Sequence, residues 1–177
     1  MTGAAEGFLI ETPRLLLRRW AAGDRGPFAA LNADPEVMRH FPSVLDRAAS
    51  DALADRCDGW FERSAAVGPG PFGLAAVERR GDGRFLGFAG LAVHRWYPDD
   101  VELGYRLARE AWGRGYATEA GTAWVAHARE VLRLPRLTSI VAPGNAASLA
   151  VAAKLGFREA WRAEREGIEH VVLVLDL

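Results

Sequence analysis

The chain has 177 residues, of which 50% are hydrophobic, and its formal net charge at pH 7 is −1. This size and composition fit one domain with a sizeable core, and the balanced charge provides no basic field for nucleic acid or an acidic membrane. Cys57 is the only cysteine, which excludes an internal disulfide and favours a reducing compartment. The opening residues lack the pattern of a secretory signal, and no stretch approaches the ~20 apolar residues of a membrane span. We therefore expect a cytoplasmic protein.

The first third of the chain predicts a strand followed by helices. A strand is expected over residues 15–20, after Thr12-Pro13. Asp24 is a residue type that caps helices, and a helix is expected from there to residue 32.

Two further helical segments follow. Asp34-Pro35 opens a short helical turn, because a proline at the first helical position removes no hydrogen bond that the helix needs. A longer helix begins at Asp46 or at Ser50 and runs to about residue 64. Its inner face is expected to contain Leu53, Cys57, Trp60 and Phe61.

The middle of the chain predicts a hairpin. Residues 68–71, Gly-Pro-Gly-Pro, form a stiff loop rather than a domain boundary, because both sides are needed to complete one core. Strands are expected over residues 72–79 and 85–94, on either side of the hairpin signal Gly81-Asp82-Gly83. Residues 97–100, Tyr-Pro-Asp-Asp, are expected to turn the chain into the next strand.

Residues 101–133 organise the whole chain, as a strand, a glycine-rich turn and a helix. The period is two over residues 101–107, which is typical of a strand, and helical over residues 116–133. A turn that opens a helix leaves backbone N–H groups free at the positive end of the helix dipole. The glycines at 113 and 115 let an anion approach that backbone, so a phosphate group is the expected guest.

The last quarter of the chain completes a sheet. A strand over residues 137–141 follows a crossover helix, which implies parallel pairing with the 101–107 strand. A helix is expected from Asn145 to residue 155, with Gly156 as its C-cap. A hairpin of residues 157–163 and 168–175 ends the chain. This order indicates a mixed α/β fold with a single parallel strand pair in the middle of the sheet.

The glycine-rich turn alone does not identify a ligand. The dinucleotide-binding pattern needs a third glycine where this chain has Thr118, and a nucleoside-triphosphate loop needs a Gly-Lys-Ser/Thr tripeptide that does not occur here. On these residues alone, a tight strand-to-helix turn without any ligand stays open.

Two segments taken together resemble the GNAT superfamily of N-acetyltransferases. Residues 112–117 are similar to the family's pyrophosphate-binding motif Q/R-x-x-G-x-G/A, with Gly115 and Ala117 at its fixed positions and Trp112 in place of Gln or Arg. The segment from Asn145 to Phe157 resembles the family's N-x-x-A/S-x-x-x-x-x-K-x-G-F pattern. The strings ETPRLLLRRW, ELGY and WGRGYATEA look like the RimJ/RimL branch, in which tryptophan is common at the first motif position.

The resemblance covers nearly the whole chain and implies a single N-acetyltransferase domain over residues 1–177. Its fold would be α/β (α+β), a mixed and mostly antiparallel sheet with flanking helices, whose central parallel strands splay apart to hold the pantetheine arm of acetyl-CoA. Gly104 favours a backbone bulge that suits this splay, the alternative being packing against Trp124 or another bulky group. The expected cofactor-binding residues are Arg106, Leu107, Trp112, Gly113, Arg114, Gly115, Tyr116, Ala117, Thr118 and Asn145.

Amine acetylation requires a base, because most amines are protonated near neutral pH. Glu102 is the candidate, since it lies near the cofactor loop and projects from the sheet face opposite Leu103. The alternative is a solvated strand glutamate or a partner of Arg106. Backbone N–H groups near Arg106 and Leu107 would stabilise the oxyanion of the reaction.

A general acid must also be found for the leaving thiolate. Many family members carry a tyrosine where this chain has Ala152. Ser148 lies one helical turn earlier on the same face and is the candidate acid. The alternative is an ordinary first-turn residue that bonds the backbone.

The remaining reactive side chains point to no further chemistry. Cys57 stands among apolar helix residues, which favours core packing over an acyl-cysteine intermediate and therefore direct transfer. The four histidines show no metal-ligand spacing, and only His40 falls in the loop that helps form the acceptor cleft in the family.

The sequence thus predicts an acetyl-CoA-dependent N-acetyltransferase that acts on a primary amine. The acceptor is either a protein N-terminus or a small molecule, and residues 24–66 would build its site. No nucleic acid, membrane or metal partner is expected, and a homodimer stays open. The rival interpretation is a catalytically silent module that binds acyl-CoA as a sensor or contacts a partner protein.

Overall fold

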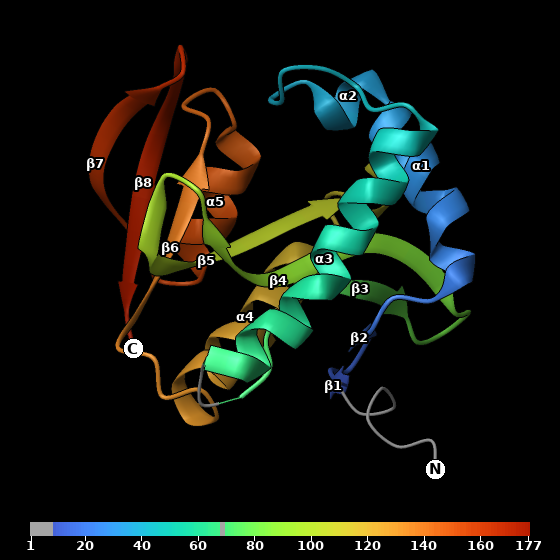
Figure 1. The fold of residues 1–177 in the computed structure, drawn as a ribbon, viewed down its shortest axis with the longest axis horizontal. Coiled ribbons are helices and arrows are strands. Elements are labelled where there is room, and N and C mark those ends of the chain that lie inside the picture. Colours follow the sequence, from blue (N-terminus) through green and yellow to red (C-terminus); the bar gives the residue numbers. More distant parts are fainter. Residues whose placement is uncertain (1–8, 68–69) are drawn as a thin grey trace.

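The computed structural model of the protein describes residues 9–67 and 70–177 (Figure 1). Part of the predicted loop at residues 68–71 therefore lies outside the described residues. Within the described part of the chain, no helix is both long and apolar enough to cross a membrane.

In the described part of the chain, one eight-stranded sheet forms the centre of the molecule, in the order β1-β2-β3-β4-β5-β6-β8-β7. Every neighbouring pair is antiparallel except β5 and β6, which are parallel. The strands are β1 Leu9–Glu11, β2 Leu15–Arg18, β3 Leu74–Arg79, β4 Arg84–His94, β5 Tyr97–Leu107, β6 Arg136–Val141, β7 Arg158–Arg165 and β8 Ile168–Asp176. The mixed α/β fold with one central parallel pair is as predicted.

Helices lie on both faces of this sheet (Figure 1). They are α1 Arg25–Ala33, α2 Pro35–Met38, α3 Arg47–Val67, α4 Tyr116–Glu130 and α5 Ala146–Lys154. Phe88 of β4 packs in a cluster with residues of α1, α2 and α3, whereas its neighbour Ala89 packs in the cluster that contains Trp124 of α4. Because side chains alternate along a strand, these two clusters lie on opposite faces of the sheet.

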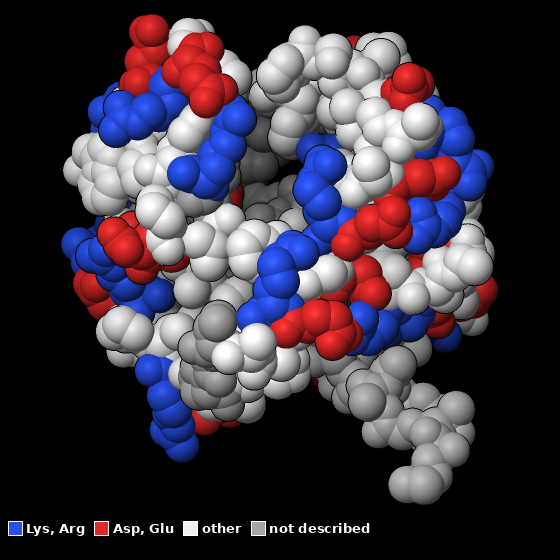
Figure 2. Space-filling model, in the orientation of Figure 1, with Lys and Arg blue, Asp and Glu red and all other residues white. Residues whose placement is uncertain are grey.

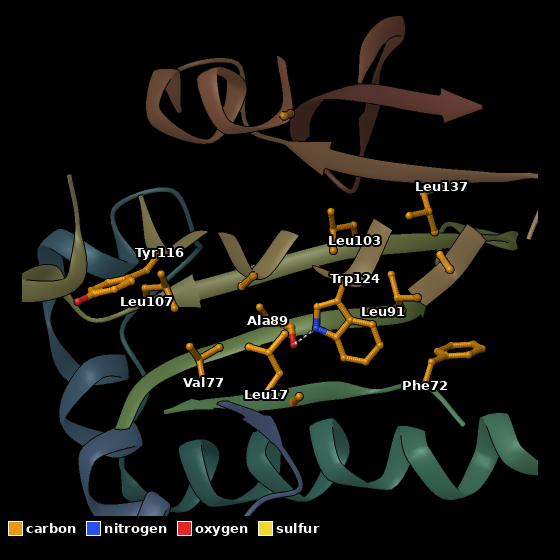
Figure 3. Close-up of a cluster of buried hydrophobic side chains, with 14 of the residues drawn as sticks. Leu17, Phe72, Val77, Ala89, Leu91, Leu103, Leu107, Tyr116, Trp124 and Leu137 are labelled. Atoms are coloured by element: carbon orange, nitrogen blue, oxygen red, sulfur yellow. Dashed lines mark hydrogen bonds between the residues drawn. The ribbon is translucent and has the colours of Figure 1, made fainter. Parts of the chain in front are cut away.

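Trp124 is the largest fully buried side chain of the core. Its indole Nε1–H donates to the carbonyl oxygen of Ala89 at 3.0 Å (Figure 3). A buried indole needs such a partner, because an unpaired N–H in an apolar interior is costly. The bond fixes α4 against β4, and with it the position at which α4 begins.

Several predicted boundaries are wrong at the strands. The three-residue strand β1 was not predicted, because a strand this short has too few residues to show a period. Residues 97–100 belong to β5, and the chain reverses at residues 95–96 instead. The Pro98–Asp100 segment is absorbed as a register shift opposite Val93 and His94, a place in a sheet where proline is tolerated.

The prediction of a bulge at Gly104 is also wrong. Gly104 pairs in register with Gly90, and no register shift occurs at this point of the β4–β5 ladder. Packing against Trp124 does not explain the glycine either, because a Cβ atom placed at Gly104 would meet no atom within 4 Å. This side of the strand faces open space.

The helix caps are only partly as predicted. Asp46 is the start of α3, since its carboxylate accepts from the N–H of Ala49 at 2.8 Å. Asp34 likewise caps α2 by accepting from the N–H of Glu36. Asp24 stands at the N-cap of α1 but makes no side-chain cap bond there. Its carboxylate binds Arg18 and the N–H of Ala21 instead.

Candidate active site

The parallel strands β5 and β6 are joined at one point and separate beyond it. Their ladder consists of a single residue pair, Glu102 with Thr138. The Thr138 hydroxyl adds a bond to the carbonyl oxygen of Val101, and Arg136 forms an ion pair with the buried Asp100. All these contacts lie at one end of the pair, so the strands are held together there and splay apart toward Leu107 and Val141.

A cleft of about 610 Å³ opens where the strands splay. Its walls come from α2 and the loop after it, from β5 and β6, from the glycine-rich turn and from α5. Figure 2 shows this face of the molecule hollowed between the α5 side and the α2 side. The site lies beyond the carboxyl ends of the parallel strands, where open α/β sheets place their ligands.

The glycine-rich turn has the backbone geometry of an anion site. Gly113 and Gly115 adopt left-handed conformations, with φ of +69° and +78°, which residues with a Cβ rarely take. Gly115 is the N-cap of α4, and within residues 9–67 and 70–177 no side chain caps the helix. The first backbone bond into α4 comes from the N–H of Glu119, so the N–H groups of residues 116–118 are free to bind an anion.

An arginine braces this turn on its outer side. Arg14 Nη1 donates to the carbonyl oxygen of Arg114 at 2.9 Å, and Arg14 Nε donates to Glu119 at 2.6 Å. Glu119 also accepts from the hydroxyl of Thr12 at 2.6 Å. The segment before β2 therefore fixes the start of α4 without occupying its free N–H groups.

The structure brings nearly all predicted site residues to one cleft. Those that line it are Glu102, Arg106, Leu107, Trp112, Gly113, Gly115, Tyr116, Ala117, Thr118, Asn145 and Ser148. Arg114 is not among the lining residues, and its Nε donates to the carbonyl oxygen of Glu110. Asn145 caps α5 by accepting from the N–H of Ser148 at 3.1 Å.

Glu102 lines the cleft, and the pKa of its carboxyl group is raised. Burial raises the pKa of its carboxyl to about 7, while an interaction with the backbone of Ile140 acts in the opposite direction. Among the described residues it forms no ion pair with Arg106, whose guanidinium binds Asn32 instead. A carboxyl group with a pKa near neutrality can both accept and release a proton at physiological pH.

A second hydroxyl lies near Ser148. Tyr105 belongs to β5, lines the same cleft, and its hydroxyl donates to the carbonyl oxygen of Ser148 at 3.4 Å. Burial raises the pKa of this phenol. Tyr105 is not among the functional residues that the sequence predicts, although its place on the splayed strand is a signal for such a role.

Two further side chains lie as the sequence suggested. Cys57 is fully buried in α3, and burial raises the pKa of its thiol to about 12, so it is not a reactive nucleophile. His40 lines the cleft beside Phe41. Desolvation, and secondarily the charge of Arg39, lower the pKa of His40, so it is uncharged near neutral pH.

Known proteins share this sequence pattern and this fold. The profile of the family described as "Acetyltransferase (GNAT) domain" matches residues 14–158. The uncharacterized protein YkkB of Bacillus subtilis is 31% identical over 149 residues, which are 83% of each chain.

Solved structures of acetyltransferases share the fold of this chain. An acetyltransferase from Agrobacterium tumefaciens is 26% identical, with a TM-score of 0.84 over 100% of this chain and 99% of its own. RimJ from Mycobacterium smegmatis, solved in complex with CoA-disulfide, is 24% identical and shares the fold, with a TM-score of 0.69 over 92% of this chain and 81% of its own.

Proposed function

The chain belongs to the GNAT family of acetyltransferases, and from this premise we propose that it transfers an acetyl group from acetyl-CoA directly to a primary amine. The observation that carries the proposal is one cleft that combines a free helix N-terminus with a carboxyl group whose pKa is about 7. The first feature suits the phosphates of a cosubstrate, and the second suits an amine that must lose a proton.

The residues present fit acetyl-CoA. The free N–H groups of residues 116–118 would hold its pyrophosphate. They lie at the positive end of the α4 dipole, and no described side chain forms a capping hydrogen bond with them. The gap between β5 and β6 would hold its pantetheine arm. When bound, the cosubstrate supplies a thioester, the activated form of the acetyl group.

Glu102 would act as the general base for the acceptor amine. The carboxylate accepts a proton from the ammonium, directly or through water, and the neutral nitrogen forms a bond to the thioester carbonyl carbon. Backbone N–H groups near Arg106 and Leu107 would stabilise the negative oxygen that develops.

Ser148 or Tyr105 would serve as the acid. When the carbon–sulfur bond breaks, the thiolate takes a proton from one of these hydroxyls. The nitrogen loses its second proton to give the neutral amide, and this proton restores the hydroxyl through water. Both groups line the cleft. Transfer would be direct, without an acyl-cysteine intermediate, because burial holds the Cys57 thiol in its neutral and unreactive form.

The acceptor is a protein N-terminus or a small amine. The rival function is a sensor that binds acyl-CoA without turnover. Thiol release from acetyl-CoA, measured across amines and N-terminal peptides, separates the two. Turnover with any amine supports the enzyme, whereas tight acetyl-CoA binding without turnover on the whole panel supports the sensor.

A further inference from the structure

The cleft carries two opposite charges on one strand. Glu102, Gly104 and Arg106 are alternate residues of β5 and therefore share one face of the sheet. Gly104 between them leaves open space where a side chain would stand. At ~3.3 Å per residue, the Cα atoms of the two charged residues lie about 13 Å apart. The floor of the cleft is thus acidic at one end, basic at the other and vacant in the middle.

The Arg106 guanidinium is held in place by neutral groups. Its Nη1 donates to Asn32 Oδ1 at 2.6 Å, and Asn32 Nδ2 donates to the hydroxyl of the buried Ser50 at 2.9 Å. The guanidinium carbon also lies 4.0 Å from the ring centroid of Phe41 and 5.6 Å from that of Phe88. These contacts orient the guanidinium, but none of them supplies a negative charge.

Arg106 differs in this respect from most arginines of the protein. Among the described residues, no carboxylate forms an ion pair with it, and its buried Nε has no hydrogen-bond partner. Desolvation lowers the pKa of its guanidinium to about 10. A desolvated cation without an anion is costly, and a carboxylate is the partner whose two oxygens match a guanidinium.

We propose that Arg106 binds a carboxylate of the acceptor, so that the substrate is a small amine that also carries a carboxylate. The inference rests on the proposed function, because it places the amine at Glu102 and the carboxylate at Arg106. The phosphates of the cosubstrate do not compete for this position, since their expected site is the start of α4, whereas Arg106 reaches toward α1 through Asn32.

Matched substrate pairs test the proposal. Glycine, β-alanine, γ-aminobutyrate and δ-aminovalerate are each compared with their carboxamides, which keep the amine and the shape but lose the negative charge. We expect at least one aminocarboxylate to be preferred over its carboxamide by about 10- to 100-fold in kcat/KM, the effect of a hydrogen bond between charged groups. Equal kcat/KM within every pair would overturn the inference and leave the acetyltransferase function standing.

Variants assign the preference to Arg106. Arg106→Gln should abolish the preference, measured as the ratio of kcat/KM between each aminocarboxylate and its carboxamide, so that any general loss of activity cancels. Arg106→Lys should keep part of the preference, since it retains the charge but not the planar fork. Arg39→Gln is the matched control, because it removes a cation from the exposed mouth of the same cleft. An equal loss of preference in Arg39→Gln would overturn the assignment.

Two further measurements separate the remaining outcomes. Calorimetry of γ-aminobutyrate with the wild type in the presence of CoA needs no turnover, so binding that Arg106→Gln loses supports the carboxylate site even if the acetyltransferase proposal fails. Peptides with a neutral C-terminal amide and an acidic or amide side chain form the second arm. A charge preference confined to these peptides would overturn the small-molecule assignment.

Discussion

The Tyr105 hydroxyl donates a hydrogen bond to the carbonyl oxygen of Ser148, at 3.4 Å, across 43 residues of sequence. The contact brings two residues that carry a hydroxyl group, one from β5 and one from α5, next to each other in the lining of the same cleft. Either hydroxyl is a candidate for the proton donor under the proposed function. The family's usual tyrosine is absent at Ala152, so Ser148 and Tyr105 are the two candidates for the acid.

Single and double substitutions assign this acid. Ser148→Ala should lower kcat more than it lowers acetyl-CoA affinity, because negative charge on sulfur develops only along the reaction path. Tyr105→Phe should have the same effect if the phenol shares the role, and the double variant then loses more than either single one. Steady-state kinetics and calorimetry give the two quantities. Unchanged kcat in all three variants would mean that water protonates the thiolate.

Replacement of Glu102 tests the general base. Glu102→Gln keeps the size of the side chain but removes the basic group, and kcat/KM should fall by about 10²-fold. In the wild type, kcat/KM should rise through an apparent pKa near 7 that is missing in the variant. The deficit should shrink again at high pH, where more of the amine is already neutral. Equal pH profiles for both proteins would place the base elsewhere.

The same substitution should change the pH dependence of stability. The pKa of Glu102 is raised from 4.5 to about 7 on folding, so the folded state favours the protonated carboxyl. Its contribution to stability is fully present below pH 4.5 and is lost as the pH rises through 7. As the pH rises from 4.5 to above 7, the wild type should lose stability that the Glu102→Gln variant keeps. The free energy of unfolding of the variant, relative to that of the wild type, should therefore increase by at most about 3 kcal/mol over this range.

Denaturant titrations of both proteins at pH 4.5, 6 and 8 measure this difference. A difference that stays constant over this range would show that Glu102 ionises normally in the folded protein. The base assignment would then lose its electrostatic support, whatever the kinetics of the variant.

The phosphate site can be tested against a conformational control. Gly115→Ala strains a left-handed backbone of φ +78° at the start of α4 and places a Cβ atom 3.4 Å from Arg14 Nη2, which braces the turn, whereas Gly167→Ala strains a φ of +75° in the distant β7–β8 turn. Each should lose about 1–2 kcal/mol of stability. Only Gly115→Ala should weaken acetyl-CoA binding, by about 10-fold or more. Equal acetyl-CoA affinity in the two folded variants would argue against the phosphate site.

Much of this site could be predicted because its parts are local in sequence. The period changes from two to 3.6 around the glycines, and this change alone predicts the strand, the turn and the helix. The Tyr97–Asp100 segment was assigned wrongly because proline and aspartate are typical of turns, while here the neighbouring strand accommodates them as a register shift. The register shift depends on the pairing of β5 with β4, which the residues of the Tyr97–Asp100 segment alone do not show.

Long-range contacts explain what the sequence did not reveal. Arg106 appeared as one polar position on a strand, and its side chain acquires a role only through Asn32, which lies 74 residues earlier. Tyr105 becomes a candidate acid only when α5 lies beside β5. The acidity of Glu102 follows from burial in the finished fold. Each of these properties depends on packing between distant elements, which periodicity does not encode.

The single residue pair between β5 and β6 also gives the sheet two edges in its interior. Beyond Glu102 and Thr138, the two strands face a gap rather than each other. Strand edges with unpaired backbone groups recruit extended chains, and an amide-bearing pantetheine arm is an extended chain of this kind. A bound cosubstrate would therefore act as an additional short strand that joins β1–β5 to the remaining strands. The connection between the two halves of the sheet would then be weaker in the free protein than in the complex with its cosubstrate.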